Sequence, residues 1–279
     1  MAQETGDPAR FTTGRVIAQS IAVFLRHPLV FAGLGILIAI PDTAFNLWYD
    51  RWSETAFEDP RATFGSPWIM VGIIAVSAGV VATIDVATYA VTEAAFTIGL
   101  FEDLRGGKVN FLRCLRGCLP ALPRLLALSL LLGWIFAVCM ALVMLIGIEG
   151  STLVMYGAIG LGGLVAFVLM VNWWVVVPAI TVEEVGAFAS LGRSLDLTRG
   201  HRWRILALVL LPSVFGVISA VLLALTVDKT GLVYRIVDFG IDTITALAGT
   251  MLSAVGYAAL RAEKEGLSVT RVDVAAVFD

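Results

Sequence analysis

The stretch LLALSLLLGWIFAVCMALVMLIGI, residues 125–148, decides the fold of this chain. It runs for 24 residues without one charged side chain, and about 20 such residues in a helix cross the hydrocarbon core of a bilayer. A buried helix of a soluble protein has no need of so long an apolar run. The stretch therefore predicts a transmembrane helix.

The composition of the whole chain points the same way. Of its 279 residues, 59% are hydrophobic and 15% are charged, and the mean hydropathy is +0.91. Soluble domains contain about 45–50% apolar and about 25% charged residues. A globule of this length cannot bury so much apolar surface, so lipid must solvate most of it. The net charge of −3 excludes a globally basic nucleic-acid-binding protein.

Five further stretches are long and apolar enough to cross a membrane. Backbone polar groups in lipid need internal partners, and without barrel-like alternation only helices provide them. We therefore predict an all-α protein, an integral membrane bundle of six transmembrane helices forming a single domain over residues 1–279. Pro41 should kink or end the first span, and residues 261–279 should form a short cytoplasmic tail. The predicted spans cover residues 29–47, 68–97, 122–148, 153–177, 205–227 and 233–260.

Lys and Arg are distributed unevenly between the two sets of connecting segments. Fifteen lie on one side of the predicted membrane and four on the other. Because cytoplasmic loops are enriched in Lys and Arg, the basic side is predicted to be cytoplasmic, together with both termini. The first 28 residues lack a continuous apolar core, so we expect no cleavable signal peptide.

A shorter amphipathic stretch precedes each pair of predicted spans on the basic side. Each places apolar side chains on one helical face and arginines elsewhere, which is typical of a helix in the membrane interface. Three repeats of one unit would produce this layout, and so would any basic amphipathic helix leading into a membrane hairpin. The apolar positions are Ile17, Ile21, Phe24 and Leu25; Phe111, Leu112, Leu115 and Leu119; and Phe188, Leu191 and Leu195.

Two short stretches of the chain resemble a known family of membrane domains. The residues concerned are Pro178, Ala179, Glu183 or Glu184, Ala189, Leu191, Arg193, Ser194, Leu197, Thr198, Arg199, Gly200 and Arg202, and then Tyr257, Leu260, Arg261, Glu265, Gly266, Phe278 and Asp279. Together they resemble the membrane domain of glycerophosphoryl diester phosphodiesterases and its stand-alone six-span bacterial relatives. The resemblance implies a protein of the bacterial inner membrane with a role in lipid or envelope homeostasis. It does not imply catalysis, so we expect a non-enzymatic protein. In the fused enzymes a separate soluble barrel of about 250 residues performs the catalysis, and this chain has no room for it.

Residues that build common catalytic and metal sites are scarce. His27 and His201 are the only histidines, and Cys114 and Cys118 share a helical face without further ligands. The chain contains no phosphate loop, nucleophile elbow or zinc-helix motif. We therefore predict no catalytic residue, no metal and no cofactor; a membrane-embedded lipid-modifying enzyme is kept as an alternative.

Asp85 is the most informative polar residue of the predicted spans. It lies about 26 Å along the second span from Trp68, where an unpaired carboxylate would cost several kcal/mol. It should face the bundle, be protonated, or contact a polar partner such as Asn172 on the fourth span. A proton or substrate site at Asp85 would indicate a small transporter or transporter subunit. A helix-to-helix hydrogen bond that fixes packing is the alternative.

Three other acidic residues lie in the predicted spans. Glu93 is expected to approach the cytoplasmic interface, eight residues after Asp85. Asp238 and Asp242 share a helical face near the outer end of the sixth span and could line a vestibule. Charges near a helix end are usually solvated, so we do not predict that these two bind a ligand.

Arginines on the basic side suggest contacts with lipid. Arg193, Arg199 and Arg202 could hold the phosphate of an anionic phospholipid, because basic residues near a membrane surface attract anionic head groups. The positive-inside rule alone would also explain them. The expected partners are the bilayer, anionic phospholipid, and a second copy of the chain or another membrane protein, but no nucleic acid.

Overall fold

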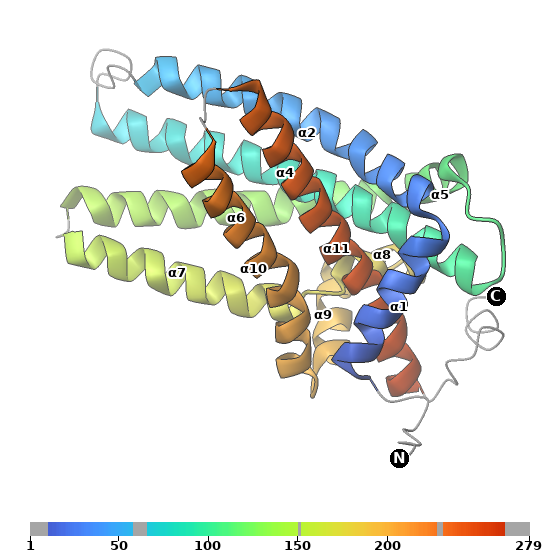
Figure 1. Ribbon diagram of the computed structural model, residues 1–279. Helices are drawn as coiled ribbons and strands as arrows, with labels where there is room; N and C mark the ends of the chain where they lie inside the picture. The colour runs from blue at the N-terminus through green and yellow to red at the C-terminus, as the bar shows by residue number, and fades with distance from the viewer. Residues whose placement is uncertain (1–10, 58–65, 150–151, 228–230, 266–279) are drawn as a thin grey trace, which may run out of the picture.

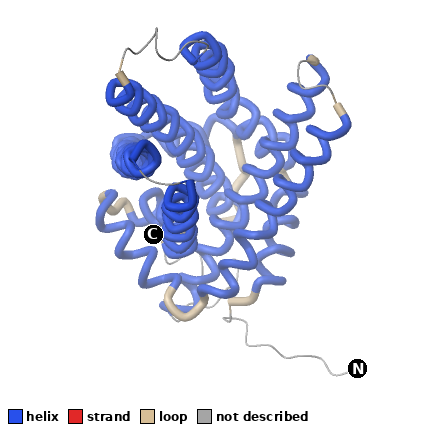
Figure 2. The backbone as a smooth tube through the Cα atoms, turned by 90° about the vertical axis from the view of Figure 1, so that its left-hand side faces the viewer, coloured by secondary structure: helices blue, strands red, loops and turns tan. Residues whose placement is uncertain are grey.

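The computed structural model describes residues 11–57, 66–149, 152–227 and 231–265, and all regular structure in them is helical. The helices are α1 (Thr13–Arg26), α2 (Pro28–Phe57), α4 (Pro67–Leu104), α5 (Phe111–Cys118), the 3-10 helix η1 (Leu119–Ala121), α6 (Leu122–Glu149), α7 (Thr152–Asn172), α8 (Val176–Glu183), α9 (Ala187–Thr198), α10 (Arg202–Thr226) and α11 (Leu232–Glu265). Figure 2 shows that the described residues form helices and loops, with no strands.

Six helical stretches of the described chain are long and apolar enough to cross a membrane, and each overlaps one predicted span. They contain α2, α4, α6, α7 with α8, α10, and α11. At 1.5 Å per residue, the 38 residues of α4 extend about 57 Å. That length exceeds the roughly 30 Å of a hydrocarbon core, so α4 also reaches into the structure at one end of the bundle.

The helices differ from the sequence expectation at two boundaries. Pro41, which was expected to kink or end the first span, does not end it, because α2 continues through it to Phe57. The span predicted over residues 153–177 is interrupted after Asn172, and α8 begins only at Val176. The Asn172 carbonyl oxygen instead accepts hydrogen bonds from Ser194 Oγ at 2.9 Å and Thr198 Oγ1 at 3.3 Å. The last span continues to Glu265, and most of the predicted tail, 266–279, lies outside the described residues.

The short helices α1, α5, α8 and α9 gather at one end of the bundle, from which the long helices extend (Figure 1). We call this the basic end, because the Lys- and Arg-rich segments meet there. The main core lies at this end and includes Phe11, Phe31, Phe96, Leu100, Leu197, Ile205, Leu208 and Tyr257. α11 is the most buried of the six spans and packs against α10, α4, α2 and α1.

Away from the basic end, the helix surfaces are apolar and exposed. On α7 and α10, for example, Leu153 is 81% and Leu225 is 78% exposed. Side chains of this kind are stable on a surface only when lipid or another apolar partner covers them.

The three predicted amphipathic stretches are helices α1, α5 and α9, but their apolar faces do not all point to the core. In α9 the buried residues include Ser190, Ser194 and Thr198, whereas Phe188 is 76% exposed. In α1 the residues Ile21 and Leu25 are exposed as well. Small polar side chains therefore pack α9 onto the bundle, and larger apolar side chains point away from it.

Candidate functional site

A pocket of about 330 Å³ lies between α2, α4 and α11. It adjoins the middle of α2 and α4 and the N-terminal half of α11, away from the basic end. Its polar lining consists of Thr43 and Asn46 from α2, Asp85, Thr88, Tyr89 and Thr92 from α4, and Arg235, Asp238, Asp242 and Thr243 from α11.

Helical spacing brings these side chains to the pocket. Asp85, Thr88, Tyr89 and Thr92 lie at positions i, i+3, i+4 and i+7 of α4, which share one face. α2 and α11 approach closely at Gly35, where an added Cβ would lie 2.5 Å from Leu247 Cδ2. Glycine at position 35 therefore permits the contact that forms one wall of the pocket.

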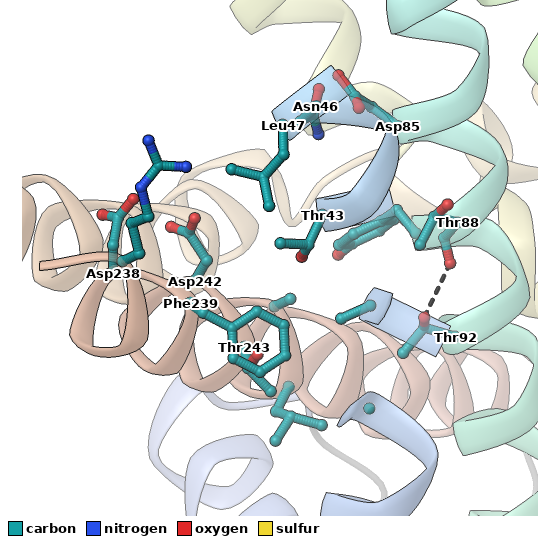
Figure 3. Close-up of a pocket in the computed structure, with 16 residues that line it drawn as sticks. Thr43, Asn46, Leu47, Asp85, Thr88, Thr92, Asp238, Phe239, Asp242 and Thr243 are labelled. Atoms are coloured by element: carbon teal, nitrogen blue, oxygen red, sulfur yellow. Dashed lines mark hydrogen bonds between the residues drawn. The ribbon is translucent and has the colours of Figure 1, made fainter. Parts of the chain in front are cut away.

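The charges in the pocket are unbalanced. Three carboxylates, those of Asp85, Asp238 and Asp242, face one guanidinium, that of Arg235. Figure 3 shows Asp238 and Asp242 on one side of the pocket and Asp85 on the other. Within the described chain, none of the three carboxylates forms an ion pair. The pocket can therefore attract a cation.

The structure does not bring the two predicted intramembrane site residues together. Asp85 lies halfway along α4 and lines the pocket. Asn172 is the last residue of α7, at the basic end, where its Nδ2 donates to the Val168 carbonyl at 2.6 Å. The partners of Asn172 are therefore in its own helix and in α9. Asp238 and Asp242, which were not predicted to be ligands, are the acidic residues that share the pocket with Asp85.

Glu93, which the sequence predicts to approach the cytoplasmic interface, is buried within the helix bundle. It is 2% exposed, and its Oε1 atom has no hydrogen-bond partner among the described residues. Between Asp85 and Glu102 it is the only charged residue of the chain. A lone carboxylate in so apolar a stretch is the sequence signal that indicates its burial.

Arg193, one of the three arginines predicted to contact lipid, is held by carboxylates. Its Nε donates to both oxygens of Glu183 at 2.9 Å, and its Nη2 donates to Glu265. Burial lowers the pKa of Arg193, but the hydrogen bonds that Arg193 donates to Glu265 and Glu183 outweigh this effect and leave its pKa raised. Arg193 therefore stabilises the basic end and has less freedom to bind a phosphate.

Arg199 and Arg202 differ from Arg193. Both are exposed, and in the described part of the chain neither has a carboxylate partner. The neighbouring Trp203 is 83% exposed. The Arg199 carbonyl accepts a hydrogen bond from Lys264 Nζ at 3.0 Å, which ties the end of α9 to α11. Two of the three predicted arginines are thus free to contact a head group.

The two histidines and the three cysteines lie in surroundings that fit structural roles. His201 packs edge-on against Phe11, with 5.3 Å between ring centroids, and its Nε2 lies 3.5 Å from Glu263. His27 lies 3.2 Å from Asp103, which also accepts from Arg26. Cys114, Cys118 and Cys139 are free thiols. Over the described ranges, no three His, Cys, Asp or Glu side chains are grouped closely enough to hold a metal ion.

A model of a family described as a domain of unknown function, DUF7847, matches residues 12–264. The chain belongs to the DUF7847 family. No curated protein and no solved structure matches this DUF7847 chain. The matched residues include all of α2 and α4 and all of α11 but its last residue, Glu265. Both the pocket and the basic end therefore belong to the DUF7847 domain. It does not connect the chain with glycerophosphoryl diester phosphodiesterases.

Proposed function

We propose that this DUF7847 protein is a non-enzymatic, multi-pass membrane protein that binds a small organic cation in the pocket between α2, α4 and α11 and transports it. One observation carries the proposal: three carboxylates and one guanidinium line a single pocket inside the membrane-spanning bundle. Polar and ionisable residues inside a membrane are costly and usually mark a solute or ion pathway.

The size and lining of the pocket favour an organic cation. A volume of about 330 Å³ is within the range of small-molecule sites, about 300–1,000 Å³. Tyr89 and Phe239 contribute aromatic rings to the lining, and aromatic faces attract ammonium groups. An ammonium ion with a short apolar part would satisfy both the carboxylates and the rings.

We further propose that the protein lies in a bacterial inner membrane with its basic end and both termini in the cytoplasm. The uneven distribution of Lys and Arg supports this orientation. The pocket would then lie in the middle and outer part of the bilayer, since it adjoins the N-terminal half of α11.

Calorimetric titration of the purified protein with tetraethylammonium, tetramethylammonium and butylamine tests cation binding. We expect Asp85→Asn and Asp242→Asn to weaken binding at least tenfold. Asp196→Asn, an exposed position on α9, is the matched control and should not change it. Equal affinity in wild type and both pocket variants would contradict the proposal. Uptake of the bound cation into proteoliposomes then tests transport.

A role in lipid or envelope homeostasis is the second candidate. It is supported by the exposed Arg199, Arg202 and Trp203 at the basic end, by the outward apolar residues of α1 and α9, and by the resemblance described above. Arginine with an interfacial tryptophan suits an anionic head group.

Native mass spectrometry in mild detergent tests the second candidate. We expect an anionic phospholipid to survive delipidation of the wild type and to be lost when Arg199 and Arg202 are both replaced by Ala. Lys108→Ala, an exposed basic control, should retain it. Identical lipid retention in all three proteins would count against a specific head-group site. Turnover of a lipid extract by the pure protein would instead favour the lipid-modifying alternative.

A further inference from the structure

Glu93 lies just beyond the inner end of the proposed cation pocket. It is one turn of α4 after Tyr89, and both Tyr89 and Thr92 line the pocket. Asp103, which binds Arg26 at the basic end, is ten residues further along, or about 15 Å. The carboxyl group of Glu93 is therefore well inside the bundle, between the pocket and the basic end.

The hydrogen-bonding partners of Glu93 suit a neutral carboxyl group. Ser253 on α11, which lies near the Glu93 carboxyl, directs its hydroxyl hydrogen to the Trp174 carbonyl oxygen, 2.8 Å away. The Ser253 oxygen can therefore accept a hydrogen bond from Glu93 but has no second hydrogen to donate. Among the described residues, the Oε1 atom of an ionised Glu93 would be buried without a donor, which is strongly unfavourable.

Tyr89 connects Glu93 with the pocket. Tyr89 lies one helical turn before Glu93 on the same face of α4, and its side chain also forms part of the pocket lining. Gly249 leaves room for the phenol, because an added Cβ there would lie 3.3 Å from the Tyr89 hydroxyl. A hydroxyl between a buried carboxyl group and a pocket can pass a proton from one to the other.

We propose that Glu93 holds a proton that the protein exchanges for the cation in the pocket. When the cation enters, the O–H bond of the Glu93 carboxylic acid breaks, the proton passes by way of Tyr89 to water in the pocket, and a carboxylate remains. The approaching positive charge favours this carboxylate. The inference rests on the proposed function, and it adds the coupling ion and the residue that carries it.

Other titratable or charged groups lie on the helices around this part of α4, and their signals must be distinguished from that of Glu93. They are Asp85 and Tyr89 on α4 itself, Arg235, Asp238, Asp242 and Tyr257 on α11, Glu183 on α8, Cys114 and Cys118 on α5, and Arg124 and Cys139 on α6. The polar residues that α2 contributes to the pocket are Thr43 and Asn46, and neither side chain titrates. A signal that disappears on substitution of Glu93 alone can be assigned to it.

Infrared difference spectroscopy of the full-length protein in liposomes tests whether Glu93 is protonated. We expect the carboxylic-acid C=O band at neutral pH in the wild type, its loss in Glu93→Gln, and its retention in Glu93→Asp and in the control Asp103→Asn. Gln keeps the shape of a protonated Glu, so Glu93→Gln should fold. A wild-type spectrum with only carboxylate absorption at Glu93 would overturn the proposal.

Titration with tetraethylammonium tests the exchange. We expect the acid band to fall as the cation binds and about one proton per bound cation to appear in weakly buffered solution. Glu93→Gln should bind the cation and release none. Binding to the wild type without proton release would overturn the exchange. If no cation binds and the acid band stays intact, both the proposed cation site and the proton exchange are contradicted. The protonated state of Glu93 would still be established by the acid band.

Discussion

The Tyr257 hydroxyl on α11 donates a hydrogen bond to Glu183 Oε1 on α8, 2.8 Å away. The two residues are 74 positions apart in the chain, and Tyr257 is completely buried. Glu183 also accepts from Arg193, so one carboxylate connects three helices of the basic end. The helices that form the walls of the pocket extend from this end of the bundle.

Replacement of Tyr257 by Phe removes that hydrogen bond and leaves the ring in place. We expect a loss of about 1–2 kcal/mol in unfolding free energy, because the bond is to a charged group that keeps its other partner. Thermal unfolding in detergent measures it. Tyr156→Phe on α7, where the side chain is 64% exposed, is the control and should have no effect. Equal melting temperatures for Tyr257→Phe and wild type would show that the bond contributes nothing.

Replacement of Arg193 by Ala should destabilise the protein more than replacement of the exposed Arg116. Arg193 neutralises Glu183 and Glu265 together, and its removal leaves both carboxylates short of donors. We expect a cost of about 1–3 kcal/mol for Arg193→Ala and about 0–1 kcal/mol for Arg116→Ala. Chemical unfolding of both variants under the same conditions provides the comparison. A smaller cost for Arg193→Ala would contradict its role at the basic end.

His201 should make the protein less stable in mild acid. Burial lowers the pKa of His201 below its usual value and outweighs the attraction of Glu263. The unfolded chain, with a histidine pKa of about 6.5, therefore binds the proton first as the pH falls, and stability declines below that pH. His201→Gln removes this contribution, so its melting temperature should fall less than that of the wild type between about pH 7.5 and 5.5. Parallel curves for the two proteins would contradict the prediction.

Two glycines of the same region should respond in opposite directions to alanine. Gly200 follows α9 with φ of +92°, a conformation that an L side chain adopts only with strain. Gly192 lies within α9, and an added Cβ there meets nothing within 4 Å. We expect Gly200→Ala to cost about 1–2 kcal/mol and Gly192→Ala to stabilise by about 0.5–1 kcal/mol. Unfolding midpoints measured side by side test both signs, and a destabilising Gly192→Ala would show an unexpected contact.

The sequence by itself determined that the chain forms six long apolar helices, and it identified Asp85 as a polar residue within one of them. Both conclusions depend on local properties. A run of about 20 apolar residues such as 125–148 is long enough to span a bilayer whatever it packs against. A carboxylate in such a run, such as Asp85, is costly in any arrangement.

Only the tertiary structure decided which polar groups meet. Asp85 shares its pocket with Asp238 and Asp242 and not with Asn172, because α11 packs against α2 and α4 while α7 ends at α9. Glu93 is buried because α4 continues past the level of the pocket into the helices of the basic end. Helical spacing specifies which side chains share a face of a helix. The helix that packs against this face depends on how each helix is rotated and placed, and many weak long-range contacts together decide that arrangement.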